Sequence, residues 1–138
     1  MVNFSWKKNK LKNRQQFQKI IKNKKRVFNN FFIIFYKKKD DQKISSQHCN
    51  LGISIPQKLA KKSNVRNKLK RVVKFAILQI SKENNFLTRI LNKWNIVIIM
   101  KNDCINLKFS EKKMQIKIIM ELAKKKILQR KIDNNGSN

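Results

Sequence analysis

The segment from residue 58 to residue 76 constrains the fold most, because it combines eight positive charges with a regular apolar repeat and contains no acidic residue. Ser63 is a favourable N-cap, and apolar residues follow it at three- and four-residue steps, so we expect a helix with one side in a core. The members of this expected apolar stripe are Val65, Leu69, Val72, Ala76 and Ile80.

The other side of the expected helix is basic. Arg66, Asn67, Lys70, Arg71 and Lys74 lie one or two turns apart and share one wall. Neighbouring cations repel one another, and a solvated helix normally relieves this repulsion with interspersed Glu. Here a polyanion would relieve it, so the pattern predicts a helix that binds RNA.

The composition agrees with a polyanion-binding protein. The 138 residues include 35 basic and 7 acidic ones, which gives a net charge of +28 and a field that attracts nucleic acid or anionic lipid. The chain is also rich in Lys, Asn and Ile, as an AT-rich genome would produce, so part of the Lys excess has a mutational explanation. That bias does not explain the shortage of acids. The length indicates one domain with a real core.

Other kinds of site find little support in the sequence. The two cysteines, Cys49 and Cys104, have no CxxC spacing, and with His48 as the only histidine neither a zinc site nor a structural disulfide is expected. Adjacent His48 and Cys49 rarely hold the geometry of a nucleophile pair, so a loop position is favoured. The longest apolar runs, residues 31–36 and 96–100, are too short to span a membrane, and no secretory signal is evident. We therefore expect a cytoplasmic protein with no membrane partner.

The remaining pattern predicts an α+β domain. Asn13 and Gln16 resemble a capping box that opens a short helix, whose apolar edge is Phe17, Ile20 and Ile21. Residues 31–36, 51–55 and 96–100 have the β-branched and aromatic content of strands, and Pro56 ends the second of them.

The rest of the chain connects these elements. Residues 37–47 form a polar loop, 81–93 a connector, and a last helix starts near Ser110. We expect one RNA-binding domain over residues 1–132, in which 1–9 form a flexible basic arm, followed by a disordered tail at 133–138.

One stretch resembles a known family. The run Arg66-Asn67-Lys68-Leu69-Lys70-Arg71, preceded by Lys58 and the strand at 51–55, resembles the signature of the bacterial ribonuclease P protein subunit, Arg-Asn-Arg, any residue, Lys-Arg. The resemblance covers roughly residues 8–128. It implies a single small α+β domain in the order α-β-β-β-α-β-α, with one mixed sheet and a left-handed β-α-β crossover.

The resemblance also implies a function. In this family a large RNA and its Mg²⁺ ions remove the 5′ leader of precursor tRNA, while the protein binds both that RNA and the single-stranded leader. On this basis the protein is a non-catalytic subunit that binds no cofactor alone, and its partners are ribonuclease P RNA and precursor tRNA, with no obligate protein partner evident. The alternative is a ribosomal or other structural RNA-binding protein. A DNA-binding helix-turn-helix is disfavoured, because no second helix lies a short turn before Ser63.

The family's functional residues map onto two sets. The resemblance places the leader in a cleft between the first helix, the basic helix and one sheet face, formed by Phe17, Ile21, Ile33, Phe35, Ser54, Arg66, Asn67, Lys70, Lys74 and Met100. The second set contacts the catalytic RNA or other phosphates and consists of Lys58, Lys61, Lys62, Lys68 and Arg71.

Some positions keep an alternative interpretation. Core packing is the alternative for Phe17, Ile33 and Phe35, although strand alternation favours a division in which Phe32, Ile34 and Tyr36 point inward. Four positions depart from the family pattern, and two of them, Asn50 and Gln57, are uncharged where basic residues are common. Ile21 replaces an aromatic residue, and Lys68 replaces an arginine and so cannot bind a phosphate in the bidentate manner of a guanidinium.

Overall fold

The computed structural model describes residues 14–136 apart from 24, 39–49 and 84–93. The elements follow in the order α2 (Arg14–Lys22), β1 (Arg26–Phe28), β2 (Phe32–Lys38), β3 (Asn50–Ser54), α3 (Ser63–Glu83), β4 (Trp94–Met100), the 3-10 helix η2 (Asn102–Cys104) and α5 (Phe109–Gly136). The predicted α+β class and its α-β-β-β-α-β-α order are confirmed. The expected arm at 1–9 and most of the expected loop lie outside the described residues.

The four strands form one mixed sheet in the order β1-β2-β4-β3. β2 pairs antiparallel with β1 and with β4, whereas β3 pairs parallel with β4. The parallel pair is joined through α3, as the β-α-β unit requires; the hand of this crossover stays a prediction. β1 was not located from the sequence, in which no strand was assigned to residues 26–28.

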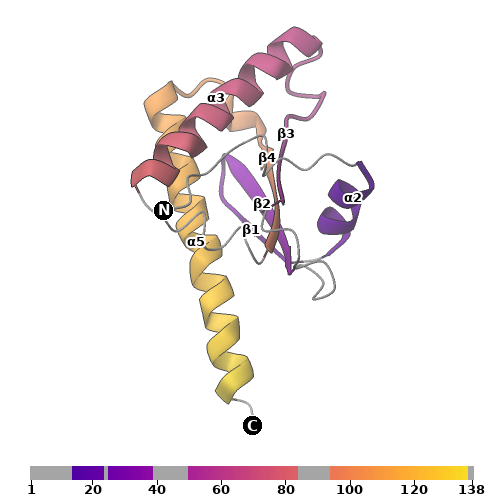
Figure 1. Ribbon diagram of the computed structural model, residues 1–138. Helices are drawn as coiled ribbons and strands as arrows, with labels where there is room; N and C mark the ends of the chain where they lie inside the picture. Colours follow the sequence, from indigo (N-terminus) through magenta and orange to yellow (C-terminus); the bar gives the residue numbers. More distant parts are fainter. Residues whose placement is uncertain (1–13, 24, 39–49, 84–93, 137–138) are drawn as a thin grey trace.

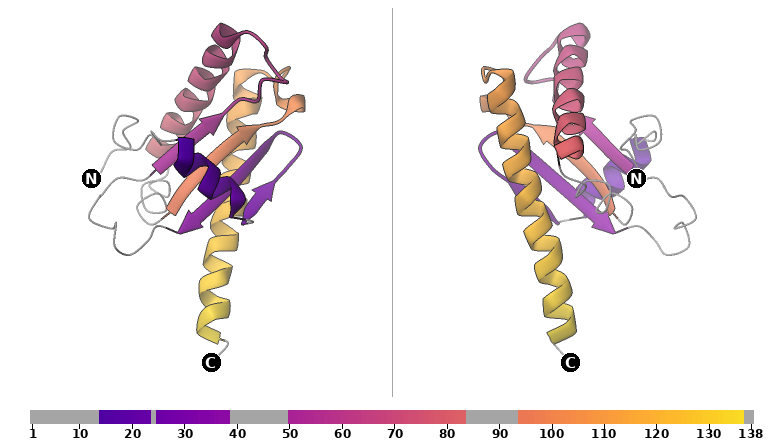
Figure 2. Two further views of the ribbon diagram at one scale, coloured as in Figure 1. Left: turned by 90° about the vertical axis from the view of Figure 1, so that its right-hand side faces the viewer. Right: turned by 60° about the vertical axis from the view of Figure 1, so that its left-hand side comes forward.

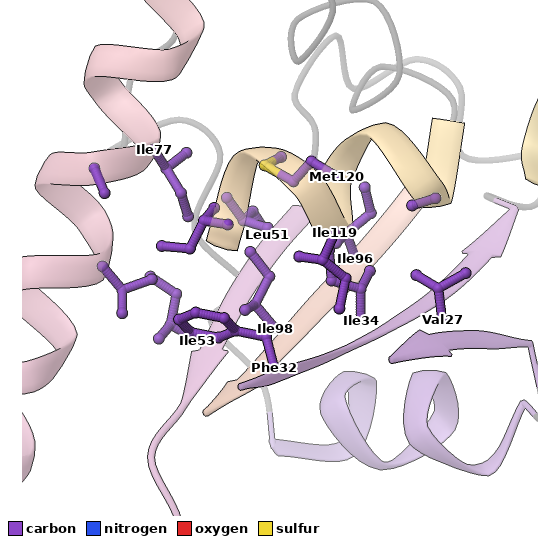
Figure 3. Close-up of a cluster of buried hydrophobic side chains, with 14 of the residues drawn as sticks. Val27, Phe32, Ile34, Leu51, Ile53, Ile77, Ile96, Ile98, Ile119 and Met120 are labelled. Atoms are coloured by element: carbon purple, nitrogen blue, oxygen red, sulfur yellow. The ribbon is translucent and has the colours of Figure 1, made fainter. Parts of the chain in front are cut away.

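The helices cover the two faces of the sheet unequally. α2 lies across one face, and α3 and α5 lie on the other (Figures 1 and 2). The main core fills the space between the sheet and the α3/α5 layer (Figure 3). Its strand residues alternate with residues of the α2 face and are Val27, Phe32, Ile34, Tyr36, Leu51, Ile53, Trp94, Ile96, Ile98 and Met100.

The buried side of α3 differs in part from the expected stripe. Ala76 and Ile80 are buried as expected, but Val73 and Ile77 are also buried, while Val65 is 42% exposed. At 100° per residue the buried stripe is centred on Val73 and Ile80, so Val65 lies at its margin in the first turn. A regular repeat predicted the helix correctly but not the centre of its buried face.

Two boundaries need correction. β2 continues through Lys37 and Lys38, which were expected in the following loop. α5 begins at Phe109, close to the expected Ser110, but continues to Gly136 and so includes residues 133–136 of the expected tail. Extending a helix costs far less than starting one, which lets α5 continue to Gly136 (Figure 1).

Candidate nucleic-acid interface

The α2 face of the sheet has a covered row of side chains. The strand registers place Arg26, Phe35, Val97 and Gly52 side by side across the four strands. α2 packs over the Phe35, Val97 and Gly52 part of this row, where its Ile20 forms a small second core with Phe35 and Val97, while Arg26 on β1 stays exposed. Phe35 is accordingly only 7% exposed.

The neighbouring row is only partly covered. We call it the open row; in the registers it runs Phe28, Ile33, Ile99, Ser54 from β1 to β3. Ile33, Ile99 and Ser54 are half-buried, and Phe28 is 62% exposed. With strands about 4.8 Å apart, the row spans roughly 14 Å of mostly apolar surface. Ile21 of α2, which is 38% exposed, adds a further apolar side chain on this helix.

Phe17 rests directly on the sheet. A Cβ atom built on Gly52 would lie 2.2 Å from the Cζ of Phe17, so the ring occupies the space that any other residue at position 52 would need. A glycine inside a strand often marks such a close approach. The Gly52–Phe17 contact thus sets how closely α2 sits against β3.

Arg66 has a structural contact on the predicted RNA-binding wall of α3. Its Nη1 donates hydrogen bonds to the carbonyl oxygens of Ala60 at 2.9 Å and Lys61 at 2.8 Å. These bonds hold the connector against the first turn of α3. Lys70 and Lys74 follow at four-residue steps and are half-buried, so they share the same side of the helix. The structure therefore brings the predicted wall together, with Asn67 exposed beside it.

The second predicted set lies on the outside of the molecule. Lys68 and Arg71 lie on the outer part of α3, and Lys58, Lys61 and Lys62 lie in the connector before it. The one acid of α3, Glu83, is at the far end of the helix. There it accepts a hydrogen bond from Lys113 of α5 at 2.8 Å, which with the charges of Lys113 and Lys117 lowers the pKa of Glu83. The basic part of α3 is thus left without a neighbouring acid on its own helix.

Comparison with known proteins identifies the family. The sequence model of the family described as Ribonuclease P matches residues 6–124. The chain belongs to the ribonuclease P protein family. It is the protein subunit of ribonuclease P and acts in the ribonucleoprotein that processes tRNA, in complex with ribonuclease P RNA. Nothing found supports the alternative of a ribosomal or other structural RNA-binding protein.

Solved structures share this fold. The ribonuclease P protein of Staphylococcus aureus is 23% identical, with a TM-score of 0.66 over 83% of this chain and 94% of that one. The protein of Thermotoga maritima is 22% identical, with a TM-score of 0.57 over 86% of this chain and 96% of that one. No curated protein matches the sequence.

Among the predicted residues of the ribonuclease P leader site, Met100 was assigned to the wrong face of the sheet. Met100 is 1% exposed and belongs to the main core, beneath α3 and α5. Side chains alternate along β4, so Met100 shares a face with Ile98, whereas the residue on the α2 face is Ile99. The predicted inward direction of Phe32, Ile34 and Tyr36 is confirmed.

Several residues of the α2 face were missed from the sequence. They are Arg26, Phe28, Ile99 and Lys101. For Ile99, the alternation along β4 was a sufficient signal. For Phe28, the signal was an aromatic residue two positions after Arg26 and directly before two asparagines, but β1 has only three residues and its period is too short to recognise.

The structure describes no alternative chemical site. Cys104 is buried, which raises the pKa of its thiol to about 11, although nearby Lys112 acts in the opposite direction. His48 and Cys49 lie outside the described residues. Within the described ranges, no three His, Cys, Asp or Glu side chains are grouped to hold a metal ion. Likewise, none of the helices that the structure describes is long and apolar enough to cross a membrane.

Proposed function

We propose that this ribonuclease P subunit binds the single-stranded 5′ leader of precursor tRNA on the α2 face of its sheet. The observation that carries the proposal is the open row, a half-exposed apolar track in a protein of charge +28. Exposed apolar and aromatic surface accepts bases of any identity, and lysines pair with phosphates, so binding is tolerant of sequence and sensitive to salt. Lys70 and Lys74 belong to α3, on the other face of the sheet, so in this proposal they take phosphates of the leader where it passes the β3 edge.

Phe17 and Phe35 take a different part in this proposal from the one expected. Phe35 lies under α2 and Phe17 rests on Gly52, so both rings hold α2 on the sheet. The surface offered to the leader is instead the open row with the exposed Ile21. The leader therefore runs beside α2 rather than beneath it.

The outward-facing cations on α3 and its connector form the second part of the proposal. Lys68, Arg71 and the three connector lysines contact phosphates of ribonuclease P RNA, which releases counterions and favours association. The RNA, with its bound Mg²⁺, performs the hydrolysis; the resemblance of residues 66–71 to the family signature supports this assignment. The cytoplasmic location expected from the sequence stays a prediction.

Leader binding is tested by separating precursor from mature tRNA. Ile33→Ala and Ile99→Ala each remove apolar surface from the open row and should weaken precursor binding by about 1 kcal/mol, or roughly fivefold, in the complex with ribonuclease P RNA. Mature tRNA, which lacks the leader, should bind as before. Ile118→Ala is the matched control, because Ile118 is an exposed isoleucine of α5, on the other side of the sheet. An equal loss with mature tRNA, or no loss at all, would contradict leader binding here.

The assignment of the chemistry has its own test. Purified protein freed of RNA should not cleave precursor tRNA, yet it should restore cleavage by ribonuclease P RNA at low Mg²⁺ by reducing phosphate repulsion. Robust cleavage by the RNA-free protein would overturn the proposed division of labour.

A further inference from the structure

Phe28 stands at the β1 end of the open row and is the most exposed large apolar side chain of the described residues, at 62%. It lies opposite Ile33 in the β1–β2 register and so shares the α2 face of the sheet. A single exposed apolar side chain is ordinary on a protein surface, but Phe28 continues the partly exposed apolar track of the open row, and such contiguous patches mark binding surfaces. Neither the family match nor the sequence pattern assigns it a role.

Two cations, one on β1 and one directly after β4, stand next to this ring. The Cζ atom of Arg26 lies 5.9 Å from the ring centroid, and the Nζ atom of Lys101, the residue after β4, lies 5.7 Å from it. Both distances fall within the range of about 6 Å for a cation–π contact. Phe28 is exposed even with these cations beside it, so a ligand can still reach part of the ring.

The cluster is held in place before any ligand arrives. Lys101 donates from Nζ to the carbonyl oxygen of Asn29 at 2.9 Å and from its backbone N–H to that of Phe31 at 2.8 Å. The Asn29 Oδ1 atom accepts hydrogen bonds from the N–H groups of Phe31 and Phe32, both at 2.8 Å. The β1–β2 turn is thereby fixed, and little conformational entropy is lost when a ligand binds to it.

We propose that Phe28, Arg26 and Lys101 bind one unpaired nucleotide at the β1 end of the open row. The ring of Phe28 stacks on the base, and a cation beside it pairs with an adjoining phosphate, which are the two contacts that proteins use for single strands. A purely apolar protein partner would make no favourable contact with the two cations beside the ring. The inference rests on the proposed binding of RNA to the α2 face and extends the track across the whole sheet, to the edge opposite β3.

Two RNAs can supply the unpaired nucleotide, the leader and a single-stranded part of ribonuclease P RNA. A leader must be long enough to cross the sheet before it can reach Phe28, whereas the affinity for ribonuclease P RNA is independent of the leader. Precursors with leaders of increasing length therefore distinguish the sources. The affinity of the reconstituted complex is measured for each precursor, and that of the protein for ribonuclease P RNA is measured separately.

Phe28→Ala should weaken binding about 5- to 150-fold, the range that corresponds to the loss of one base stack. Phe28→Trp, which keeps the aromatic face, should retain most of the affinity. Phe109→Ala is the matched control, because Phe109 is an exposed phenylalanine of α5 that pairs with Phe75 instead. Because Phe28 is so exposed, its truncation removes little buried surface and should leave the protein folded, which circular dichroism checks for each variant.

Each outcome decides the proposal. A loss that appears only with longer leaders supports the site and assigns it to the leader, and a loss of affinity for ribonuclease P RNA supports it with that RNA as the source. If Phe28→Ala matches Phe109→Ala in both measurements, the proposal is overturned. If Ile33→Ala still reduces leader binding in the same experiment, leader binding on the α2 face remains supported although the site at Phe28 is not. If the wild-type complex shows no leader dependence, the proposed function fails, and the RNA measurement alone decides the role of Phe28.

Discussion

Replacing Gly52 by Ala tests whether one close contact positions α2. The new Cβ atom would lie 2.2 Å from the Cζ of Phe17 and 2.7 and 2.8 Å from the two adjoining ring carbons. Carbon atoms in favourable contact are about 3.5 to 4.0 Å apart, so the ring must retreat by more than roughly 1 Å. Phe17 belongs to α2, whose Ile20 packs on Phe35, and the retreat therefore loosens that second core as well.

The expected cost follows from overpacking, which typically destabilises a protein by about 1 to 3 kcal/mol. A strand glycine with ordinary backbone angles would otherwise gain about 0.4 to 1 kcal/mol on substitution by alanine, because the unfolded chain loses freedom. The sign of the change thus separates the two effects. Urea denaturation measures it as a shift in midpoint, and Ser54→Ala, two residues along on the same face, serves as the control with a change within about 0.5 kcal/mol.

A second substitution identifies the cause. Phe17→Leu shortens the side chain that meets the new methyl group, so the double variant should be more stable than the sum of the single changes predicts, by about 0.5 kcal/mol or more. Leader binding should weaken in Gly52→Ala and partly recover in the double variant. If Gly52→Ala is as stable as the parent, or if the two changes are additive, the ring does not rest on Gly52 and the reasoning is refuted.

Other substitutions test the wall, the core and the buried thiol. Arg71→Ala should weaken association with ribonuclease P RNA and reduce the salt slope by roughly 0.7 to 0.9 for each phosphate that is no longer neutralised; an unchanged slope would remove Arg71 from the interface. Phe32→Ala and Phe35→Ala should both lower the free energy of unfolding by about 3 to 5 kcal/mol, since both rings are buried, and a much smaller decrease for Phe35 would place its ring toward solvent. In a Cys49→Ser variant, labelling of Cys104 near pH 8 should require opening of the core and accelerate in urea. Burial raises the pKa of Cys104 to about 11, so its contribution to stability is present below the pKa of the unfolded thiol and is lost as the pH rises towards 11. In alkaline denaturation, the free energy of unfolding of Cys104→Ala should therefore fall less with rising pH than that of the parent protein.

Much of the fold was predictable because the pattern of apolar residues is strong in its long elements. The repeat after Ser63 and the alternation in residues 31–36 predicted α3 and the two faces of β2 correctly. β1 escaped prediction because it has three residues, of which only Val27 is buried. So short a strand is defined by its partner rather than by its own pattern.

The site was harder to predict because it depends on register. The wall of α3 follows from helical spacing alone, and the structure brings it together as expected. The open row depends on which residues of four strands lie side by side, which no single segment specifies. The wrong face assigned to Met100 has a different cause, because the alternation along β4 alone would have selected Ile99.

The parallel pairing of β3 links the basic helix to the sheet in a way that amide hydrogen exchange can detect. β3 is an edge strand whose ladder partner is β4, and Leu51 meets Ile96 only after the chain has passed through α3. Closing so long a segment costs entropy, which α3 offsets in part by packing on the sheet with Val73 and Ile77. RNA that neutralises the cations of α3 stabilises the closed arrangement over its local opening. The amides of β3 should therefore exchange more slowly in the complex than in the free protein, even where no RNA atom touches them.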